Sequence, residues 1–279
     1  MIETFIQYLD RLQLIKHITA FINAIPFPYS HLPVSVHGHK MTAHKSDRYL
    51  ALWLWKLGLL GKTELTFLSK LCQPNMHIVD IGANVGLYSL IFAMNIGQNG
   101  KVWAFEPDVG NFDMLKRNIQ HNQYYNIMPI QKAVSNQSGI IKLYISDYHN
   151  GDHRTYQTTD KRTAIEIESV SLDDFFVAGE RIDLIKMDIQ GAEGFALQGM
   201  TQILKNNPQV KIFTEFWPFG LQQAGFESEK MISDLQACGF NIKYMSLKTN
   251  TWKNVDNPTE VVTELEPNKY TNLLVDHNP

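Results

Sequence analysis

Residues 77–107 constrain the fold more than any other stretch of this chain. A short apolar run ends on Asp80, and a turn containing Gly82 and Gly86 follows. An apolar helical pattern and a second apolar run, ending on Glu106, complete the stretch. The pattern predicts a strand, a tight turn, a helix and a second strand. In an open parallel sheet, ligands bind outside the carboxyl ends of the strands, so both acids are expected to face one ligand.

The rest of the chain keeps alternating between apolar runs and helical patterns. Strands are expected at residues 76–81, 102–105, 127–134, 182–188, 210–216, 240–246 and 270–276. Such alternation is typical of an α/β fold with a doubly wound, mostly parallel sheet. A closing hairpin of the last two strands adds an antiparallel edge strand. We therefore predict a Rossmann-like α/β fold.

Two further segments interrupt this order. Residues 140–146 and 164–170 have the period-two pattern of strands, and the polar loop 147–162 joins them. The pattern predicts a β-hairpin inserted between the third and fourth strands of the sheet.

Residues 1–73 are expected to form a helical extension that packs on a domain spanning residues 74–279. Apolar residues at near-helical spacing predict an amphipathic helix over the first 24 residues, for which a membrane surface or a partner is the alternative to the domain's own flank. Further helices are expected at 48–59 and 63–72, with a short strand or hairpin at 34–44 between them.

Composition makes some classes of protein less favoured than others. The chain has 279 residues, 25 Lys and Arg against 28 Asp and Glu, and no basic block, which disfavours nucleic acid as a partner. Its two cysteines predict free thiols in a reducing compartment. No apolar run is long enough for stable membrane insertion, and no signal peptide is recognisable, so we expect a soluble, cytoplasmic protein. Oligomerisation stays open.

No metal site is expected. Four histidines fall between residues 31 and 44, but they have no cysteine or carboxylate ligands near them in sequence. Surface or half-buried histidines are the favoured interpretation. A divalent ion held by Asp188, Glu193 or Glu215 is the alternative, although no spacing in the sequence demands one.

The glycine turn departs from the dinucleotide fingerprint. Gly-x-Gly-x-x-Gly starting at Gly82 requires glycines at positions occupied by Asn84 and Leu87. A pyrophosphate needs close backbone approach at the second glycine, so NAD and FAD are disfavoured. S-adenosylmethionine, which has an amino-acid part and a ribose but no phosphate, suits the turn better. Glu106, with Pro107 fixing the turn behind it, is placed to accept both ribose hydroxyls. A turn with a purely structural role is the alternative.

Several motifs together resemble those of FkbM-type S-adenosylmethionine-dependent methyltransferases. In chain order they lie at residues 79–89, 105–107, 133–135, 171–173, 185–193 and 215–216. The resemblance runs from about residue 74 to residue 225. Its most specific part is the Lys-Met-Asp-x-x-Gly-Ala-Glu block at 186–193. One departure is Gln190, where the family usually has Glu, which puts an acid role at that position in doubt.

The resemblance implies a class I methyltransferase fold and methyl transfer, typically to a hydroxyl oxygen. Carried over from the family, the residues that hold the methionine end of the cofactor are Asp80, Gly82, Ala83, Asn84 and Gly86. Glu106 holds the ribose, and Asp188 lies beside the methionine and the transferring methyl.

Methyl transfer is an in-line displacement, so the protein mainly aligns the acceptor oxygen, the methyl carbon and the sulfur. A hydroxyl acceptor must also lose its proton, which calls for a general base; the candidates are Asp188, His153, Glu215 and, less so, Glu193, whose place in a first helical turn has a structural explanation. Contacts to the acceptor are expected from Asp152, His153, Arg154, Tyr156, Glu193 and Trp217. For the loop residues a solvated hairpin tip is the alternative, and for Trp217 it is plain packing.

The leading hypothesis is an S-adenosylmethionine-dependent O-methyltransferase that acts on a hydroxyl of a small molecule or sugar-like acceptor. The alternatives are a non-catalytic binding or scaffold protein of the same fold, a nucleotide-dependent dehydrogenase and an RNA methyltransferase. The sequence does not name the acceptor, and analogy of fold does not supply it.

Overall fold

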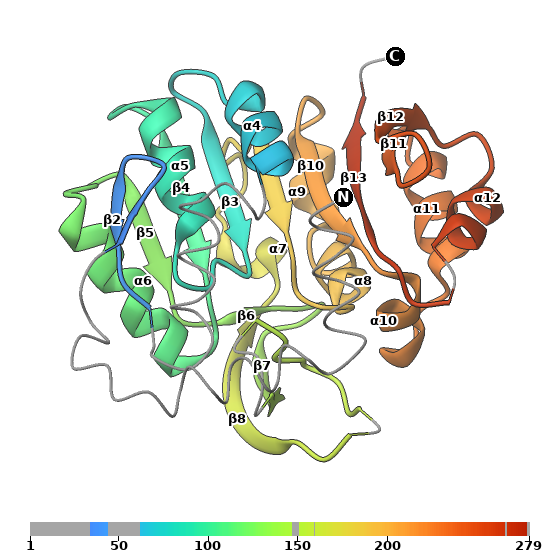
Figure 1. Cartoon of the computed structure of the whole chain (residues 1–279), viewed down its shortest axis with the longest axis horizontal. Coiled ribbons are helices and arrows are strands. Elements are labelled where there is room, and N and C mark those ends of the chain that lie inside the picture. The colour runs from blue at the N-terminus through green and yellow to red at the C-terminus, as the bar shows by residue number, and fades with distance from the viewer. Residues whose placement is uncertain (1–33, 44–61, 147–150, 159, 266, 278–279) are drawn as a thin grey trace.

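The computed structural model describes residues 34–43, 62–146, 151–158, 160–265 and 267–277. Its centre is an eight-stranded sheet of order β12-β11-β13-β10-β9-β3-β4-β5 (Figure 1). The parallel part of the sheet consists of β5 (Ile127–Ile130), β4 (Lys101–Phe105), β3 (His77–Ile81), β9 (Leu184–Met187) and β10 (Lys211–Phe216). Chain order reverses between β3 and β9, which is the switch point where open α/β sheets bind ligands. The predicted doubly wound α/β fold is confirmed.

The antiparallel end of the sheet is larger than predicted. As expected, β11 (Asn241–Ser246) and β13 (Thr271–Asp276) pair antiparallel, but β13 lies inside the sheet, between β10 and β11. The edge strand is β12 (Thr251–Asn254), from a segment expected to be a polar loop. Trp252 explains this strand, because its ring packs 4.7 Å from that of Phe67 and anchors an otherwise polar segment. Helix α12 (Pro258–Glu264) follows, capped by Asn257.

The predicted inserted hairpin is present, and it recruits a third strand. β7 (Gly139–Ile145) and β8 (Thr163–Val170) pair antiparallel, while β6 (Ala133–Val134) pairs parallel with β8. The strand expected at 127–134 is therefore wrong in extent, because the chain leaves the main sheet after β5 and joins the hairpin. This small sheet lies beside the carboxyl ends of the parallel strands (Figure 1).

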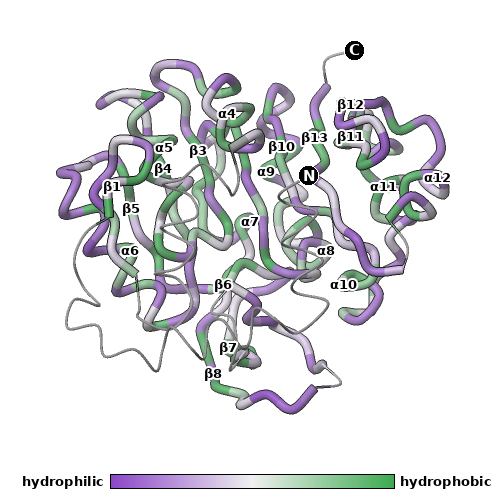
Figure 2. Tube along the Cα trace, viewed as in Figure 1, coloured by the Kyte–Doolittle hydropathy of each residue, from purple (hydrophilic) through white to green (hydrophobic). Residues whose placement is uncertain are grey.

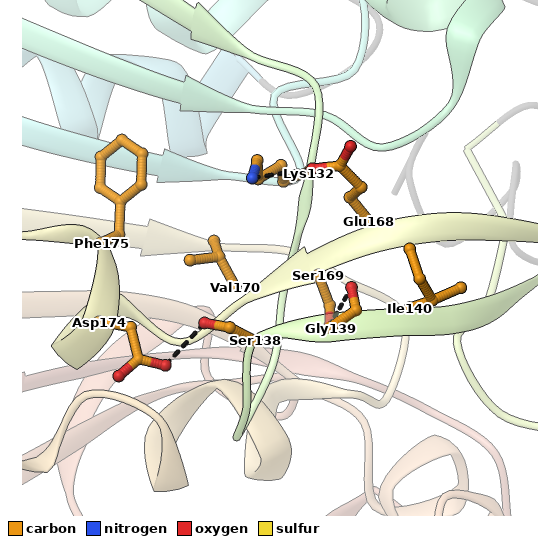
Figure 3. Close-up of a pocket in the computed structure, with 9 residues that line it drawn as sticks. All are labelled: Lys132, Ser138, Gly139, Ile140, Glu168, Ser169, Val170, Asp174 and Phe175. Carbon is orange, nitrogen blue, oxygen red and sulfur yellow. Dashed lines mark hydrogen bonds and ion pairs between the residues drawn. The ribbon is translucent and has the colours of Figure 1, made fainter.

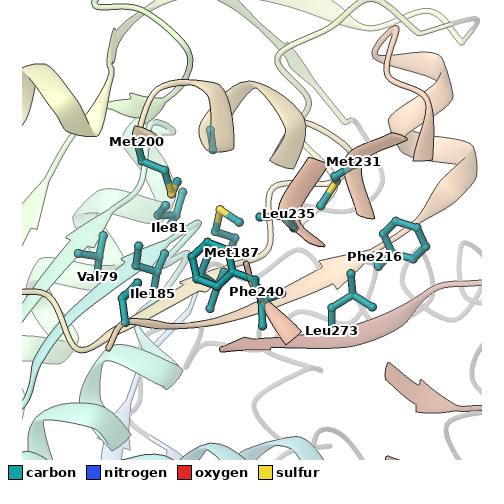
Figure 4. Close-up of a cluster of buried hydrophobic side chains, with 14 of the residues drawn as sticks. Val79, Ile81, Ile185, Met187, Met200, Phe216, Met231, Leu235, Phe240 and Leu273 are labelled. Atoms are coloured by element: carbon teal, nitrogen blue, oxygen red, sulfur yellow. The ribbon is translucent and has the colours of Figure 1, made fainter. Parts of the chain in front are cut away.

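Helices cover both faces of the main sheet, because alternate strand residues point to opposite sides. One face packs against α7 (Leu172–Phe175), α8 (Glu193–Gln198), α9 (Thr201–Asn206), α10 (Pro218–Gln223) and α11 (Ser228–Ala237), and its core is shown in Figure 4. The other packs against α4 (Lys62–Leu71), α5 (Leu87–Ile96) and α6 (Val109–His121). Figure 2 shows the hydrophobic residues gathered along the central strands.

The helix expected after the fourth strand is broken into α8 and α9. Gly199 lies at the break, and a Cβ there would come within 2.0 Å of the Ser135 carbonyl oxygen. The chain needs glycine at this position because the two backbones meet. Ser171 caps α7 as its sequence predicts, accepting a hydrogen bond from the Asp174 backbone N–H.

The described part of the N-terminal region contains the predicted hairpin, formed by β1 (Val34–Val36) and β2 (His39–Met41), and the predicted helix α4. The helices expected at 1–24 and 48–59 lie outside the described residues, as do His31 and His44. His39 is buried, contrary to the favoured surface or half-buried interpretation, and its Nε2 lies 2.8 Å from the Tyr124 hydroxyl. Among the residues described, no helix has the length and apolar character needed to cross a bilayer.

Candidate functional site

Four acids lie where the central strands end. Asp80 is the next-to-last residue of β3, and Glu215 is the next-to-last residue of β10. Glu106 and Asp188 directly follow β4 and β9. The sheet order places these strands next to one another. We call the carboxyl ends of β3, β4, β9 and β10 the carboxyl edge. It is the site that the sequence predicts.

The glycine turn after β3 is shaped by a close approach of two backbones. The N–H groups of Gly82 and Ala83 donate to the Phe105 carbonyl at 3.0 and 2.9 Å. Gly82 has φ of 77°, and a Cβ on it would lie 2.1 Å from the Asp188 carbonyl oxygen. Asn84 is also left-handed, with φ of 54°. The turn therefore folds against the end of β9 only because position 82 has no side chain.

Lys186 is a site residue that the sequence reasoning missed. It lies on β9 with 2% of its side chain exposed, and its Nζ is 3.4 Å from Asp80 Oδ1 and 3.2 Å from the Gly82 carbonyl oxygen. Ser89 donates to Asp80 Oδ2 at 2.6 Å. Burial lowers the pKa of Lys186, but the carboxylates of Asp80, Asp188 and Glu64 outweigh burial and raise it. The available signals were its place inside an apolar run and at the start of the 186–193 motif.

Glu106 connects the glycine turn to the start of α6. Its Oε2 accepts a hydrogen bond from the Asn84 backbone N–H at 2.8 Å, and its Oε1 accepts one from Asp108 N–H at 3.0 Å. Burial raises the pKa of Glu106 to about 7, although these hydrogen bonds act in the opposite direction. Pro107, half-buried, follows directly. The carboxylate thus lies at the edge as predicted and already organises the backbone there.

Asp188, Glu193 and Glu215 form a second acidic group at the edge. Glu193 begins α8, and its Oε1 accepts from the Ile189 N–H at 3.0 Å, while burial raises its pKa to about 7. Burial and the charges of Asp188, Glu193 and Glu64 raise the pKa of Glu215 well above its usual range. Gln190 Nε2 donates to Asp188 Oδ1 at 2.8 Å. Burial and the neighbouring negative charges thus favour the protonated forms of Glu193 and Glu215.

The described part of the inserted loop folds back onto the carboxyl edge. Tyr156 is buried, and its hydroxyl donates to the Gln190 carbonyl at 2.7 Å. His153 Nε2 is 4.0 Å from Asp108 Oδ2, and its Nδ1 accepts from the Ser146 N–H at 3.1 Å. The loop therefore contacts the segments that follow β4 and β9. Residues 151–156 are half-buried or buried and cover this part of the edge, whereas Gln157, Asp160 and Lys161 are exposed.

The Asp152 carboxylate forms ion pairs with two arginines of its own loop. Its Oδ1 pairs with Arg154 at 2.7 Å, and its Oδ2 pairs with Arg162 at 2.6 Å. The Arg154 guanidinium lies 4.8 Å from the centre of the Trp217 ring, on the segment that follows β10. Trp217 Nε1 donates to Asn268 Oδ1 at 2.6 Å. The arginine-on-tryptophan contact is how the loop reaches the end of β10.

A surface hollow elsewhere does not coincide with this site. It is lined by residues of β7, β8 and α7 and their neighbours (Figure 3). Its polar side chains pair with one another, because Lys132 contacts Glu168 at 2.8 Å and Ser138 donates to Asp174 at 2.6 Å. None of the predicted site residues lines it. The carboxyl edge, with its buried charges, is the better candidate.

Known proteins resemble this chain over the same region. The family model described as the methyltransferase FkbM domain matches residues 80–242. Methyltransferase sdnD of Sordaria araneosa is 29% identical over 160 residues, which cover 46% of this chain and 61% of that protein. Hexuronic acid methyltransferase AglP of Haloferax volcanii is 28% identical over 130 residues, 46% of this chain and 51% of that protein. The chain thus matches about half to three-fifths of the length of these relatives.

Among solved structures, an rRNA methylase from Streptococcus thermophilus superposes with a TM-score of 0.46 and 10% identity, covering 77% of this chain and 93% of that one.

Proposed function

The chain belongs to the FkbM methyltransferase domain family, and from this we propose that it is an S-adenosylmethionine-dependent O-methyltransferase acting on a hydroxyl of a small or sugar-like acceptor. The observation that carries the proposal is the meeting of Asp80, Glu106 and Asp188 around the glycine turn at the switch point of the sheet. The printed name of one relative, a hexuronic acid methyltransferase, supports a sugar-like acceptor.

The residues of the carboxyl edge fit this cofactor. Gly82 lets the turn fold against the end of β9, because a Cβ there would meet the Asp188 carbonyl oxygen, so the turn and Asp188 lie side by side where the methionine end is proposed. Asp188, which directly follows β9, supplies a carboxylate that complements a sulfonium and an ammonium, while Asp80 is paired with Lys186. In the proposal, the segment from Asp80 to Gly86 holds the methionine end and Glu106 with Pro107 holds the ribose. Bound S-adenosylmethionine supplies an electrophilic methyl group.

The acceptor hydroxyl must lose a proton, and the geometry favours Asp188 or Glu215 over His153 as the group that takes it. His153 Nδ1 already accepts a backbone N–H, and its Nε2 faces the Asp108 carboxylate. A neutral imidazole in this position carries its proton on Nε2, pointing to the acid. His153 is thereby suited to hold the loop against the segment after β4. In the proposal, Asp188 or Glu215 takes the proton of the acceptor hydroxyl.

The acceptor pocket is proposed between the loop and the end of β10. Arg154, Tyr156 and Trp217 form its walls, because the guanidinium lies over the indole ring and 5.9 Å from the centre of the phenol ring. Such a cover excludes water from the reacting atoms, which strengthens electrostatic interactions there. In the proposal, Glu193 in the first turn of α8 adds a carboxyl group to this pocket.

Calorimetric titration with S-adenosylmethionine tests the cofactor half of the proposal. The wild type should bind, and Glu106→Ala should bind at least about tenfold more weakly, the loss expected when a charged hydrogen-bond partner is removed. Glu166→Ala, an exposed position on β8, is the matched control and should bind normally. Absence of binding by the folded wild type would refute the proposal.

Transfer of labelled methyl groups to a panel of hydroxylated acceptors, with hexuronic acids included, tests the second half. His153→Ala and Arg154→Ala should lower turnover and leave cofactor affinity nearly intact. Equal losses of both would show that the loop acts on the cofactor or on folding. Cofactor binding without transfer to any hydroxylated acceptor would instead favour a non-catalytic binding protein.

A further inference from the structure

Gln190 connects two of the acids at the carboxyl edge. Its side-chain Nε2 donates to Asp188 Oδ1 at 2.8 Å and lies 3.4 Å from Glu215 Oε2. The amide NH2 group has two hydrogens, so it can donate to both acids at once, and this end of the amide faces them. One neutral donor therefore spans the ends of β9 and β10.

The backbone that carries this amide is held on both sides. Gln190 has φ of 57°, a left-handed conformation that is uncommon for a residue with a side chain. Its carbonyl oxygen accepts the Tyr156 hydroxyl at 2.7 Å. A Cβ on Gly191 would lie 2.6 Å from the Gly220 carbonyl carbon and 2.7 Å from the Tyr156 oxygen. The inserted loop and α10 thus hold Gln190 in place, and its amide points to the two acids from a fixed position.

The surroundings of the two acids carry more negative than positive charge. The titratable groups around them, taken by element, are Glu64 on α4, Asp80 on β3, Tyr88 on α5, Lys186 on β9, Glu193 on α8 and Tyr156 in the loop. Lys186 is the one cation in this set, and it is engaged with Asp80 and the Gly82 carbonyl. Burial and the charges of Asp188, Glu193 and Glu64 raise the pKa of Glu215 well above its usual range, so this carboxyl group retains its proton readily.

Building on the proposed methyltransferase function, we propose that Gln190 is a positioning residue that makes Asp188 and Glu215 a pair sharing one proton, with one carboxylate left ionised to deprotonate the acceptor. The acceptor hydroxyl proton moves to that carboxylate. The oxygen keeps the bonding electrons and forms its bond to the methyl carbon, while the carbon–sulfur pair stays on sulfur. A carboxylate at position 190 would add a third acceptor and a negative charge, and the pair would lose its shared donor.

Carbon-detected NMR of the side-chain carboxyl groups tests this without cofactor or acceptor. The ¹³C-labelled wild type is titrated with acid, and the Asp188 and Glu215 signals are assigned with Asp188→Asn and Glu215→Gln. The test variants are Gln190→Glu and Gln190→Met. Gln198→Glu, the same change at an exposed position on α8, is the matched control. Thermal unfolding shows whether each variant is folded. If Gln190→Glu does not fold, the comparison of the wild type with Gln190→Met still tests the proposal.

In the wild type, the two signals should titrate together in two steps, as coupled groups do. Gln190→Glu should raise the upper midpoint by about one pH unit or more, which is about tenfold in proton affinity, and Gln190→Met should raise it less. Gln198→Glu should leave both midpoints unchanged. Independent titration of the two acids, or unchanged midpoints in both Gln190 variants, would overturn the inference. Failure of the wild type to bind S-adenosylmethionine would overturn the proposed function alone, because these titrations need no ligand.

Discussion

The Lys186 ammonium lies 3.4 Å from Asp80 Oδ1, and the two side chains are 2% and 0% exposed. The contact is an ion pair rather than a well-directed hydrogen bond, because Asp80 Oδ1 has no hydrogen-bond donor in the described structure. Lys186 also donates to the Gly82 carbonyl, so one cation joins β9 to the end of β3 and to the turn that follows. A buried charge is costly without its partner, so each side chain depends on the other.

Replacement of Lys186 by Met should therefore destabilise the protein by about 3–5 kcal/mol, the range for breaking a buried ion pair. It should also weaken binding of S-adenosylmethionine, because the glycine turn loses its tie to β9. Urea denaturation and calorimetry measure the two effects. Lys205→Met, at an exposed position on α9, should change neither. Wild-type stability in Lys186→Met would show that the pair is not needed.

Two glycines with positive φ separate conformational strain from steric contact. Gly82 and Gly97 have φ of 77° and 73°, but a Cβ meets the Asp188 carbonyl at 2.1 Å only at Gly82 and open space at Gly97. Gly97→Ala should cost about 1–3 kcal/mol, the strain of a side chain at φ 73° and ψ −179°, a backbone region essentially restricted to glycine. Gly82→Ala should cost more than that and abolish cofactor binding, because the turn must move away from β9. Equal losses in chemical denaturation would assign the whole effect to strain.

The raised pKa of Glu193 should lower the free energy of unfolding as the pH rises from acid to neutral. Burial raises its pKa from 4.5 to about 7, so the folded state binds this proton more tightly than the unfolded chain. The stabilisation is complete below the unfolded pKa and is lost as pH rises through the folded one, a difference on the order of 3 kcal/mol. Glu106 contributes in the same direction.

Glu193→Gln should remove only part of this slope, because burial raises the pKa values of Glu106 and Glu215 in the same direction. Urea denaturation at a series of pH values measures the slope, and Glu227→Gln, at an exposed position, serves as control. A slope unchanged by Glu193→Gln would mean that this carboxyl titrates normally in the folded protein.

Tyr156→Phe should release the inserted loop from the carboxyl edge. The substitution keeps the buried ring but removes the 2.7 Å hydrogen bond to the Gln190 carbonyl. We expect a loss of about 1 kcal/mol in local stability, read as faster amide hydrogen exchange in residues 151–158 and 189–191. Tyr125→Phe, at a position 93% exposed, should leave the exchange rates unchanged. Unaltered exchange in Tyr156→Phe would show that the hydroxyl does not hold the loop.

The pattern of apolar runs in the sequence predicted where the acids at the strand ends lie. Asp80 and Glu106 each stand at the end of an apolar run, so their place at the sheet edge follows from the strands themselves. The same reasoning missed β12, because one half-buried tryptophan in a polar segment leaves no period to recognise. It extended the third strand too far, because no local signal marks where the chain passes from one sheet to another.

The sequence by itself determined the order of strands and helices, the glycine turn and the acids at the strand ends, since these arise from residues close together in the chain. Only the tertiary structure decided which charges meet. Lys186 contacts a carbonyl 104 positions away, and Gln190 bridges to an acid 25 positions away. Neither partner can be identified from its own segment. The reason is physical: the pairing of buried charges is set by distances through space, and these exist only once β3, β9 and β10 lie side by side.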